Sequence, residues 1–192
     1  IETKFDIIVK PIDVTNYLVD LETNNQTKIV QDSTGVLYEA HQRGGYVEVF
    51  KSLDEGISWI NTEVPVYSGV ERMRPTLVVG ANDIVYLFFL EKYNESAVVA
   101  YMEYNGTRWI NRGSVKAQDS TNQLDVAVSA DSNGTLMVVW IEGDKENEEI
   151  KVLRSATISN RVINIIPDNI IKGEGQSSPT VVSSGVNKFL VF

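Results

Sequence analysis

A short acidic loop carries five residues whose types and spacing could do chemistry: Ser52, Asp54, Gly56, Ser58 and Trp59, in the order S-x-D-x-G-x-S-W. A carboxylate in a glycine-centred loop could bind a metal ion or transfer a proton. The same residues could instead hold a tight turn, because an aspartate accepts hydrogen bonds from nearby backbone N–H groups and a glycine takes positive φ. The two serines would then hydrogen-bond across the base of the hairpin, and the tryptophan would pack between neighbouring elements. We favour the structural interpretation, since it accounts for all five residues without a ligand.

A degenerate copy of this pattern occurs further along the chain. It comprises Asn105, Gly106, Thr107 and Trp109 of "YNGTRW", with an amide where the carboxylate would be. A third corresponding segment, "SATISNRVI", has lost the pattern. Loss of the acidic residue from some copies indicates that each copy braces its own turn.

Few other residues suggest catalysis or metal binding. His41 is the only histidine, and it lacks the Ser and Asp partners of a hydrolase triad and the further ligands of a zinc site. The acidic segment 142–149, "EGDKENEE", could bind calcium, but its spacing matches no ligand pattern and a solvated hairpin tip fits better. Residues 130–134, "ADSNG", are likewise interpreted as a turn. We therefore predict no catalytic residue, no metal ligand and no cofactor, with calcium as the only ion considered.

Charge and composition narrow the classes of partner. The formal net charge is −9, and no cluster of Lys and Arg stands out. A nucleic-acid partner is not expected, because such binding depends on cationic side chains that neutralise phosphates. The absence of cysteine excludes a disulfide framework and thiolate metal sites. The longest uninterrupted apolar run, residues 84–90, is far shorter than the roughly 20 residues of a membrane helix, so no membrane span is expected.

Four N-x-S/T sequons could accept N-linked glycans. They begin at Asn25, Asn94, Asn105 and Asn133. Such triplets are used only in a secretory setting, and two of them also have the composition of turns. The sequons favour a location at the cell exterior.

The chain consists of short apolar or alternating runs separated by clusters of Gly, Asn, Asp and Ser, which predicts strands and turns throughout. One module recurs: an apolar strand, a turn and a second, more apolar strand. Its copies are residues 28–41, 75–89, 125–140 and 179–192. The second strands, over 84–89, 136–140 and 189–192, are apolar on both faces, as expected of strands covered on both sides.

A third, alternating strand and a fourth strand follow each of the first three copies. Each unit therefore holds four strands in roughly 45 to 53 residues, a period typical of propeller blades. We predict an all-β fold, a β-propeller of four-stranded antiparallel blades, with about three full blades and a partial fourth. The predicted segments are a lead-in over 1–26, blades over 27–65, 75–115 and 124–168, and a partial blade over 179–192.

The fourth unit stops after its second strand and leaves an apolar edge. The N-terminal segments "FDIIV" and "NYLVDLE" could supply a closing strand or a strand of a preceding blade. Alternatively, the chain is part of a larger propeller. Four blades would be a small ring for this period, so we favour the larger propeller.

The S-x-D-x-G-x-S-W pattern resembles the Asp-box of the sialidase-like (BNR repeat) β-propeller superfamily. It matches all five defining positions and falls where that superfamily places the box, between the third and fourth strands of a blade. The resemblance of the repeats extends over residues 27–192. It implies a propeller whose boxes lie at the periphery, away from the central cleft, and therefore a structural role for Asp54.

The resemblance to sialidases also implies a catalytic set: three arginines that clamp a substrate carboxylate, a Tyr and Glu nucleophile pair, an Asp acid/base and an early R-I-P-type motif. The arginines of this chain are Arg43, Arg72, Arg74, Arg108, Arg112, Arg154 and Arg161. None lies in an R-[IL]-P triplet, and the nearest match is "ERMRPTL". We interpret Arg72 and Arg74 as a solvated strand entrance, while an active site completed by residues outside this segment stays open.

These features predict a non-catalytic binding or structural module of an extracellular or virion-surface protein, in which a rigid propeller presents loops to a glycan or protein partner. Exposed tyrosines that could stack on sugars are Tyr46, Tyr93, Tyr101 and Tyr104, although a tyrosine in a strand usually packs in a core. One alternative is a fragment of a sialidase-like glycoside hydrolase whose catalytic residues lie largely outside this segment. Another is an architectural repeat that associates with further blades of the same or a larger chain.

Overall fold

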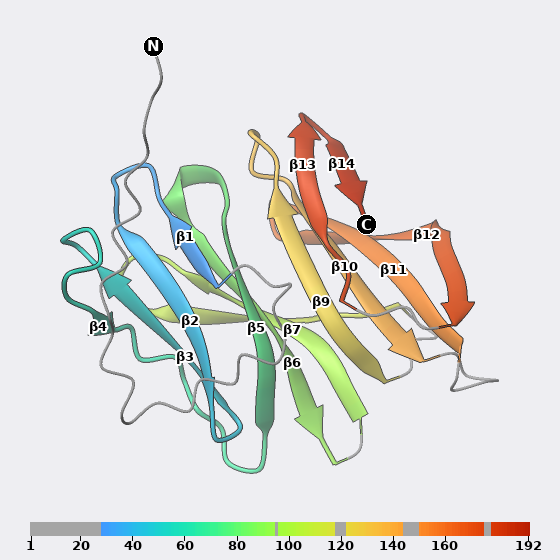
Figure 1. The fold of residues 1–192 in the computed structure, drawn as a ribbon, viewed down its shortest axis with the longest axis horizontal. Helices are drawn as coiled ribbons and strands as arrows, with labels where there is room; N and C mark the ends of the chain where they lie inside the picture. Colours follow the sequence, from blue (N-terminus) through green and yellow to red (C-terminus); the bar gives the residue numbers. More distant parts are fainter. Residues whose placement is uncertain (1–27, 95, 118–121, 144–149, 175–177) are drawn as a thin grey trace.

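The structure, a computed structural model, describes residues 28–94, 96–117, 122–143, 150–174 and 178–192. Within these ranges the chain forms strands β1 to β14 and one short 3-10 helix, η1 (Ala81–Asp83). The strands make four antiparallel sheets that follow one another along the chain (Figure 1). The predicted lead-in over residues 1–26, with both segments considered for ring closure, lies outside the described residues.

Each of the first three sheets is a meander of four strands in sequence order. The first sheet, blade 1, consists of β1 (Ile29–Gln31), β2 (Leu37–Arg43), β3 (Tyr46–Ser52) and β4 (Ile60–Asn61). Blade 2 consists of β5 (Glu71–Val79), β6 (Val85–Tyr93), β7 (Ser96–Tyr104) and β8 (Trp109–Val115). Blade 3 consists of β9 (Gln123–Ala130), β10 (Leu136–Gly143), β11 (Ile150–Ser159) and β12 (Val162–Glu174), and the partial blade 4 of β13 (Val181–Gly185) and β14 (Lys188–Val191).

Successive blades pack face to face through shared hydrophobic cores. Neighbouring residues of one strand enter different cores, because side chains in a strand alternate between its faces. Phe88 joins the core shared with blade 3, and Phe89 joins the core shared with blade 1. The first strands, β1, β5, β9 and β13, lie next to one another (Figure 1). This is the arrangement of propeller blades, and it confirms the predicted all-β propeller of four-stranded antiparallel sheets.

The second strands of blades 2 and 3 are buried on both faces over most of their length, as the apolar pattern predicts. Leu87 of β6 and Val138 of β10 have no exposed surface. Burying such a side chain contributes about 1.5–3 kcal/mol. β14 has the same pattern but differs, with Leu190 50% exposed. Among the described residues only blade 3 packs against this sheet, through a core that includes Phe189, so the other face of β14 stays uncovered.

The two ends of the stack carry different connections. The hairpin end carries the β2–β3 and β6–β7 hairpins and the starts of β5 and β9; it is the lower end in Figure 1. The turn end carries the β1–β2, β3–β4, β9–β10 and β11–β12 turns.

Turns of neighbouring blades contact one another at the turn end. The carboxylate of Asp83 accepts hydrogen bonds from the backbone N–H and the hydroxyl of Ser33, at 2.8 and 2.6 Å, and joins blades 1 and 2. Asp131 accepts a hydrogen bond from the backbone N–H of Asn187 at 2.8 Å and joins blades 3 and 4. Between them, Gly134 of blade 3 lies so close to Ala81 of blade 2 that a Cβ would collide, and its φ of +77° suits glycine as well.

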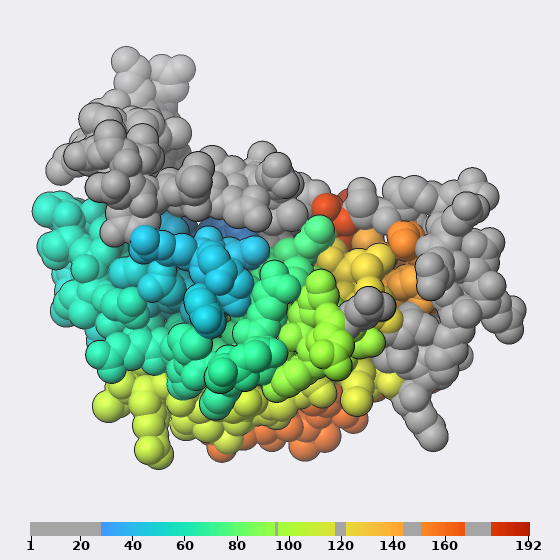
Figure 2. Space-filling model, turned by 90° about the horizontal axis from the view of Figure 1, so that it is seen from below, coloured from blue at the N-terminus to red at the C-terminus, as the bar shows by residue number. Residues whose placement is uncertain are grey.

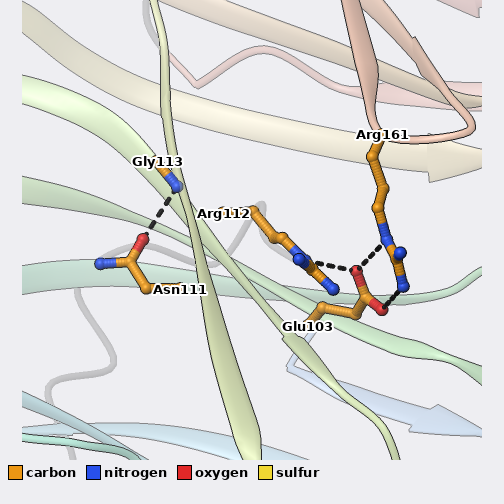
Figure 3. A network of polar contacts seen from close by, with 5 residues as sticks. All are labelled: Glu103, Asn111, Arg112, Gly113 and Arg161. Carbon is orange, nitrogen blue, oxygen red and sulfur yellow. Dashed lines mark hydrogen bonds and ion pairs between the residues drawn. The ribbon is translucent and has the colours of Figure 1, made fainter.

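A buried carboxylate also joins blades 2 and 3 (Figure 3). Glu103 of β7 accepts hydrogen bonds from Nε of Arg112, at 2.8 Å, and from Nε and Nη2 of Arg161, at 3.2 and 2.8 Å. Arg112 sits in a bulge of β8, which turns its side chain toward Glu103, and Arg161 lies in the β11–β12 turn. Burial opposes ionisation, but the hydrogen bonds from the two guanidinium groups outweigh it and lower the pKa of Glu103.

Candidate functional site

The Asp54 loop lies between β3 and β4 at the turn end, and its polar groups bond to one another. Asp54 accepts hydrogen bonds from the hydroxyl of Ser58 (2.5 Å), the backbone N–H of Ser58 (2.8 Å) and the hydroxyl of Ser52 (2.8 Å). The hydroxyl of Ser52 also accepts the backbone N–H of Gly56 at 2.8 Å. These bonds, those from Ser58 foremost, lower the pKa of Asp54 to about 2. The carboxylate is thus occupied by donors of its own turn.

Gly56 and Trp59 complete this loop. Gly56 has a φ of +85°, which a side chain would strain. A Cβ at Gly56 would lie 3.7 Å from Cζ2 of Trp59 and 3.7 Å from Cδ1 of Leu37, so the indole lies beside the glycine within blade 1. Trp59 is half-buried, while Leu53 and Ile57 of the same loop are exposed.

The degenerate copy lies at the corresponding place in blade 2, between β7 and β8. Oδ1 of Asn105 accepts the backbone N–H groups of Thr107 and Arg108, at 3.1 and 3.0 Å, and Gly106 has a φ of +88°. Trp109 is buried in the core between blades 1 and 2. The amide therefore makes bonds only to backbone groups, while the indole reaches the neighbouring blade.

The sequons fall on turns and hairpins. Asn94, Asn105 and Asn133 are exposed, the first in the β6–β7 hairpin and the other two in tight turns. Asn25 lies outside the described residues.

Arg72, at the hairpin end, is buried, so its interpretation as part of a solvated strand entrance is wrong. Its guanidinium donates to the carbonyl of Pro65 at 2.5 Å and to Oε1 of Glu91 at 3.2 and 3.3 Å. Its Cζ lies 4.9 Å from the ring centre of Tyr67 and 4.7 Å from that of Phe89. The loop before β5 supplies Tyr67 and β6 supplies Phe89, so the local sequence around Arg72 does not reveal these cation–π contacts.

Arg74 has a different environment two residues further on. Its φ is +53°, at an irregularity of β5 between Met73 and Thr76. Its backbone N–H donates to Oε1 of Gln42 at 2.7 Å. Nη1 lies 3.1 Å from Oδ2 of Asp125, and the arginine side chain is 35% exposed whereas that of Asp125 is 4% exposed. The side chain thus presents a partly exposed cation beside a nearly buried carboxylate, on the first strands of two blades.

Blade 3 places a further ion pair at the same end. Glu142, near the end of β10, pairs with Arg154 of β11 and accepts the indole N–H of Trp140 at 3.1 Å. Charged pairs involving Arg72, Arg74 and Arg154 therefore gather at the hairpin end.

An open groove of about 460 Å³ lies at the hairpin end, between the β2–β3 hairpin of blade 1 and the β6–β7 hairpin of blade 2. Figure 2 views the molecule from this side. Residues that line the groove include Gly44, Gly45, Tyr46, Glu71, Lys92 and Asn94. The groove brings together hairpins that are far apart in the sequence, and no motif in either hairpin indicates it.

The four tyrosines considered for sugar stacking separate into two pairs. Tyr46 and Tyr93 are 46% and 53% exposed, and both lie at the hairpin end. Tyr101 and Tyr104 are buried, so the suggestion that they are exposed is wrong. Tyr101 stacks on Phe88, and Tyr104 lies against Trp109 in the neighbouring core. Both lie in β7, whose alternate positions are covered by blades on either side.

Within the described ranges, no group of three or more His, Cys, Asp or Glu residues could hold a metal ion. Most of the acidic segment 142–149 lies outside those ranges. In the 130–134 turn, Oδ1 of Asp131 accepts the backbone N–H groups of Asn133 and Thr135, both at 2.9 Å. Nε2 of His41 lies 3.3 Å from Oε2 of Glu39. No helix in the described part of the chain has the length and apolar character needed to cross a membrane.

No protein-family model matches the sequence, and no curated protein matches it. Solved structures do resemble it. A variant of the NanB sialidase from Streptococcus pneumoniae is 15% identical with a TM-score of 0.55, over 80% of this chain and 25% of that one. A family 117 glycoside hydrolase from the marine bacterium Zobellia galactanivorans is 11% identical with a TM-score of 0.54, over 86% and 64% of the two chains. A protein of unknown function from Dyadobacter fermentans DSM 18053 is 10% identical with a TM-score of 0.56, over 83% and 46%.

At these identities the similarity shows the fold alone. The chain spans between a quarter and two thirds of the length of these three structures. The propeller class is therefore shown by the sheets and by these neighbours, whereas the Asp-box resemblance rests on the residues of the Asp54 loop.

Proposed function

We propose that this chain is part of a non-catalytic, glycan-binding β-propeller of an extracellular or surface protein, and that the hairpin end is its binding face. The observation that carries the proposal is the environment of Arg74. The side chain of Arg74 is partly exposed beside a nearly buried carboxylate at the hairpin end. The guanidinium of Arg74 and the carboxylate of Asp125 offer a donor and an acceptor to ligand hydroxyl groups.

Three further observations support this proposal. Two of the structural neighbours are, by name, a sialidase and a glycoside hydrolase. The exposed sequons at Asn105 and Asn133 suit a protein of the cell exterior. The net charge of −9 disfavours a nucleic-acid partner.

The Asp54 loop and its degenerate copy at Asn105 have a structural role in this proposal. The side-chain oxygens of Asp54 and Asn105 accept hydrogen bonds from donors of their own turns. Both also lie at the turn end, away from the proposed binding face.

A glycan array probed with the full-length protein tests the proposal. We expect the wild-type protein to bind glycans and Arg74→Ala to lose part of that binding, because the site loses its partly exposed cation. Arg108→Ala removes an exposed arginine at the turn end and serves as the matched control, with binding unchanged. A wild-type protein that binds no glycan, or full binding by Arg74→Ala, would contradict the proposal.

A sialidase-like glycoside hydrolase is the second candidate, with catalytic residues largely outside this segment. The nearly buried carboxylate of Asp125 on a first strand favours it. Turnover of a fluorogenic sialoside panel by the full-length protein would support this candidate, whereas glycan binding without turnover would support the non-catalytic module. If the protein neither binds glycans nor turns over sialosides, a protein partner or a purely architectural role would be favoured.

A further inference from the structure

The groove between the β2–β3 and β6–β7 hairpins is separate from the contacts of Arg74. It is formed by residues of the two hairpins, by Gly69 and Val70 of the connection before β5, and by Glu71 at the start of β5. Its volume of about 460 Å³ lies within the roughly 300–1,000 Å³ typical of small-ligand sites. Gly45 has a φ of +81°, which suits glycine, and a Cβ there would lie 3.4 Å from Cγ of Glu71, so the hairpin lies next to this side chain.

A tyrosine with a large exposed surface lines the groove. Tyr46 is 46% exposed. A phenol ring offers an apolar face and a polar tip, which matches a sugar ring with its apolar C–H face and its hydroxyl edge.

The charged residues of the groove are available to a ligand. Glu71 and Lys92 face each other across β5 and β6, with Nζ and Oε2 4.0 Å apart and side chains 50% and 39% exposed. An exposed pair at this separation contributes little to stability, so both groups can turn to a ligand at small cost. A carboxylate accepts hydrogen bonds from hydroxyl groups and an ammonium group donates them, while the amide of Asn94 can do both.

We infer that this groove binds a neutral saccharide of one or two sugar rings. Tyr46 stacks on the ring, and Glu71, Lys92 and Asn94 bond to its hydroxyl groups. An acidic sugar would bring a carboxylate toward Glu71 on a protein of net charge −9, and this repulsion selects against it. The inference rests on the proposed glycan-binding function, but its residues and its ligand class are independent of Arg74.

Calorimetric titration of the full-length protein tests the inference. Production in a bacterium without N-glycosylation leaves Asn94 unmodified. The probes are neutral mannan, xylan and β-glucan fragments, together with acidic alginate and polygalacturonate fragments. We expect Tyr46→Ala to weaken binding of a neutral fragment roughly tenfold. Tyr46→Phe keeps the ring and should stay within about twofold of the wild type.

Lys92→Ala should weaken the same binding about threefold, since one hydroxyl partner is lost. Lys188→Ala, an exposed lysine of β14, is the matched control and should bind as the wild type does. Unchanged melting temperatures exclude misfolding of the variants. If Tyr46→Ala does not fold, the binding of Lys92→Ala decides the inference.

Three results would overturn the inference. If wild type and Tyr46→Ala bind neutral fragments equally, the groove is not the binding site. If Arg74→Ala then loses that binding, the proposed function stands and the ligand binds beside Arg74. If the protein binds only acidic fragments, the ligand of the groove is not a neutral saccharide. Failure of the wild-type protein to bind any fragment or any arrayed glycan excludes the proposed function as well.

Discussion

The turns that follow β3 and β7 have corresponding positions in their blades, and the second carries a degenerate copy of the first pattern, but they are stabilised differently. The carboxylate of Asp54 bonds to the hydroxyl groups of Ser52 and Ser58 and to one backbone N–H. The amide of Asn105 bonds to two backbone N–H groups. The first turn therefore has a charged acceptor at its centre, and the second has a weaker, neutral one.

The tryptophans of the two turns differ in burial, and the turn with the weaker acceptor has the more deeply buried ring. Trp59 is half-buried within its own blade, whereas Trp109 is 6% exposed in the core between blades 1 and 2. The indole N–H of Trp109 donates to the hydroxyl of Thr62 in the connection after β4, at 2.9 Å. Trp109 thus contacts the blade that precedes its own, whereas among the described residues no blade precedes that of Trp59.

The β11–β12 turn of blade 3 continues this trend. It has neither the acidic residue nor the tryptophan, and its Arg161 reaches Glu103 of blade 2. The three turns thus range from local bonding to bonding between blades. This comparison predicts how replacement of each contact should affect stability.

Trp109→Ala should cause the largest loss. Removal of a buried tryptophan costs about 3–5 kcal/mol of unfolding free energy, because a cavity remains between two blades. Trp59→Ala should cost about 1 kcal/mol, since that ring is half-exposed. Urea denaturation followed by circular dichroism measures both, with Trp109→Phe as a control that keeps an aromatic ring but loses the bond to Thr62. Equal costs for the two tryptophans would contradict the comparison.

Glu103→Gln should cost about 2–3 kcal/mol, because two guanidinium groups lose the charged partner that neutralises them. The same denaturation experiment measures this loss. Arg161→Ala should cost less, since Glu103 keeps its bond to Arg112. A larger loss for Arg161→Ala than for Glu103→Gln would show that the arginine contributes mainly through other contacts.

Asp54→Asn should have the smallest effect, and that effect should depend on pH. The pKa of Asp54 is about 2 in the folded protein, below the ordinary value of 3.8. The stabilisation from this carboxylate is therefore complete above about pH 4 and is lost as the pH falls toward 2. We expect the melting temperature of the variant to lie below that of the wild type at neutral pH and to converge with it in acid.

The reciprocal variant Asn105→Asp is the matched control. It places a carboxylate in the second turn and should gain a small stabilisation that disappears over the same acidic range. Neither variant should alter glycan binding, because both turns lie at the turn end. A pH-independent difference for Asp54→Asn, or a loss of glycan affinity, would refute the structural role of this loop.

Residue patterns of short range account for much of the architecture. The recurring pairs of strands around Gly and Asp turns predict the meanders, and the apolar pattern of β6 and β10 predicts strands covered on both faces. The Asp54 loop was assigned from five residues within eight positions, and its hydrogen bonds join groups at most four residues apart. Such features are predictable because all participants lie in one local segment.

The candidate binding face was not predictable in this way. Arg72 was expected in solvent, but it is buried under a loop and bonded to Glu91, 19 residues further along the chain. The groove depends on the approach of hairpins from two blades, and neither hairpin has a motif that requires the other. Tyr101 and Tyr104 were placed among exposed tyrosines because strand position alone does not show which faces of a sheet are covered.

Local sequence therefore determined the strands, the turns and the propeller repeat, because backbone conformation and side-chain alternation act within a few residues. Only the tertiary structure decided which charges are buried, which tyrosines face solvent and where a groove opens. Glu103 and Arg161 illustrate the reason: their bond spans 58 positions of the chain and exists only because two blades pack face to face.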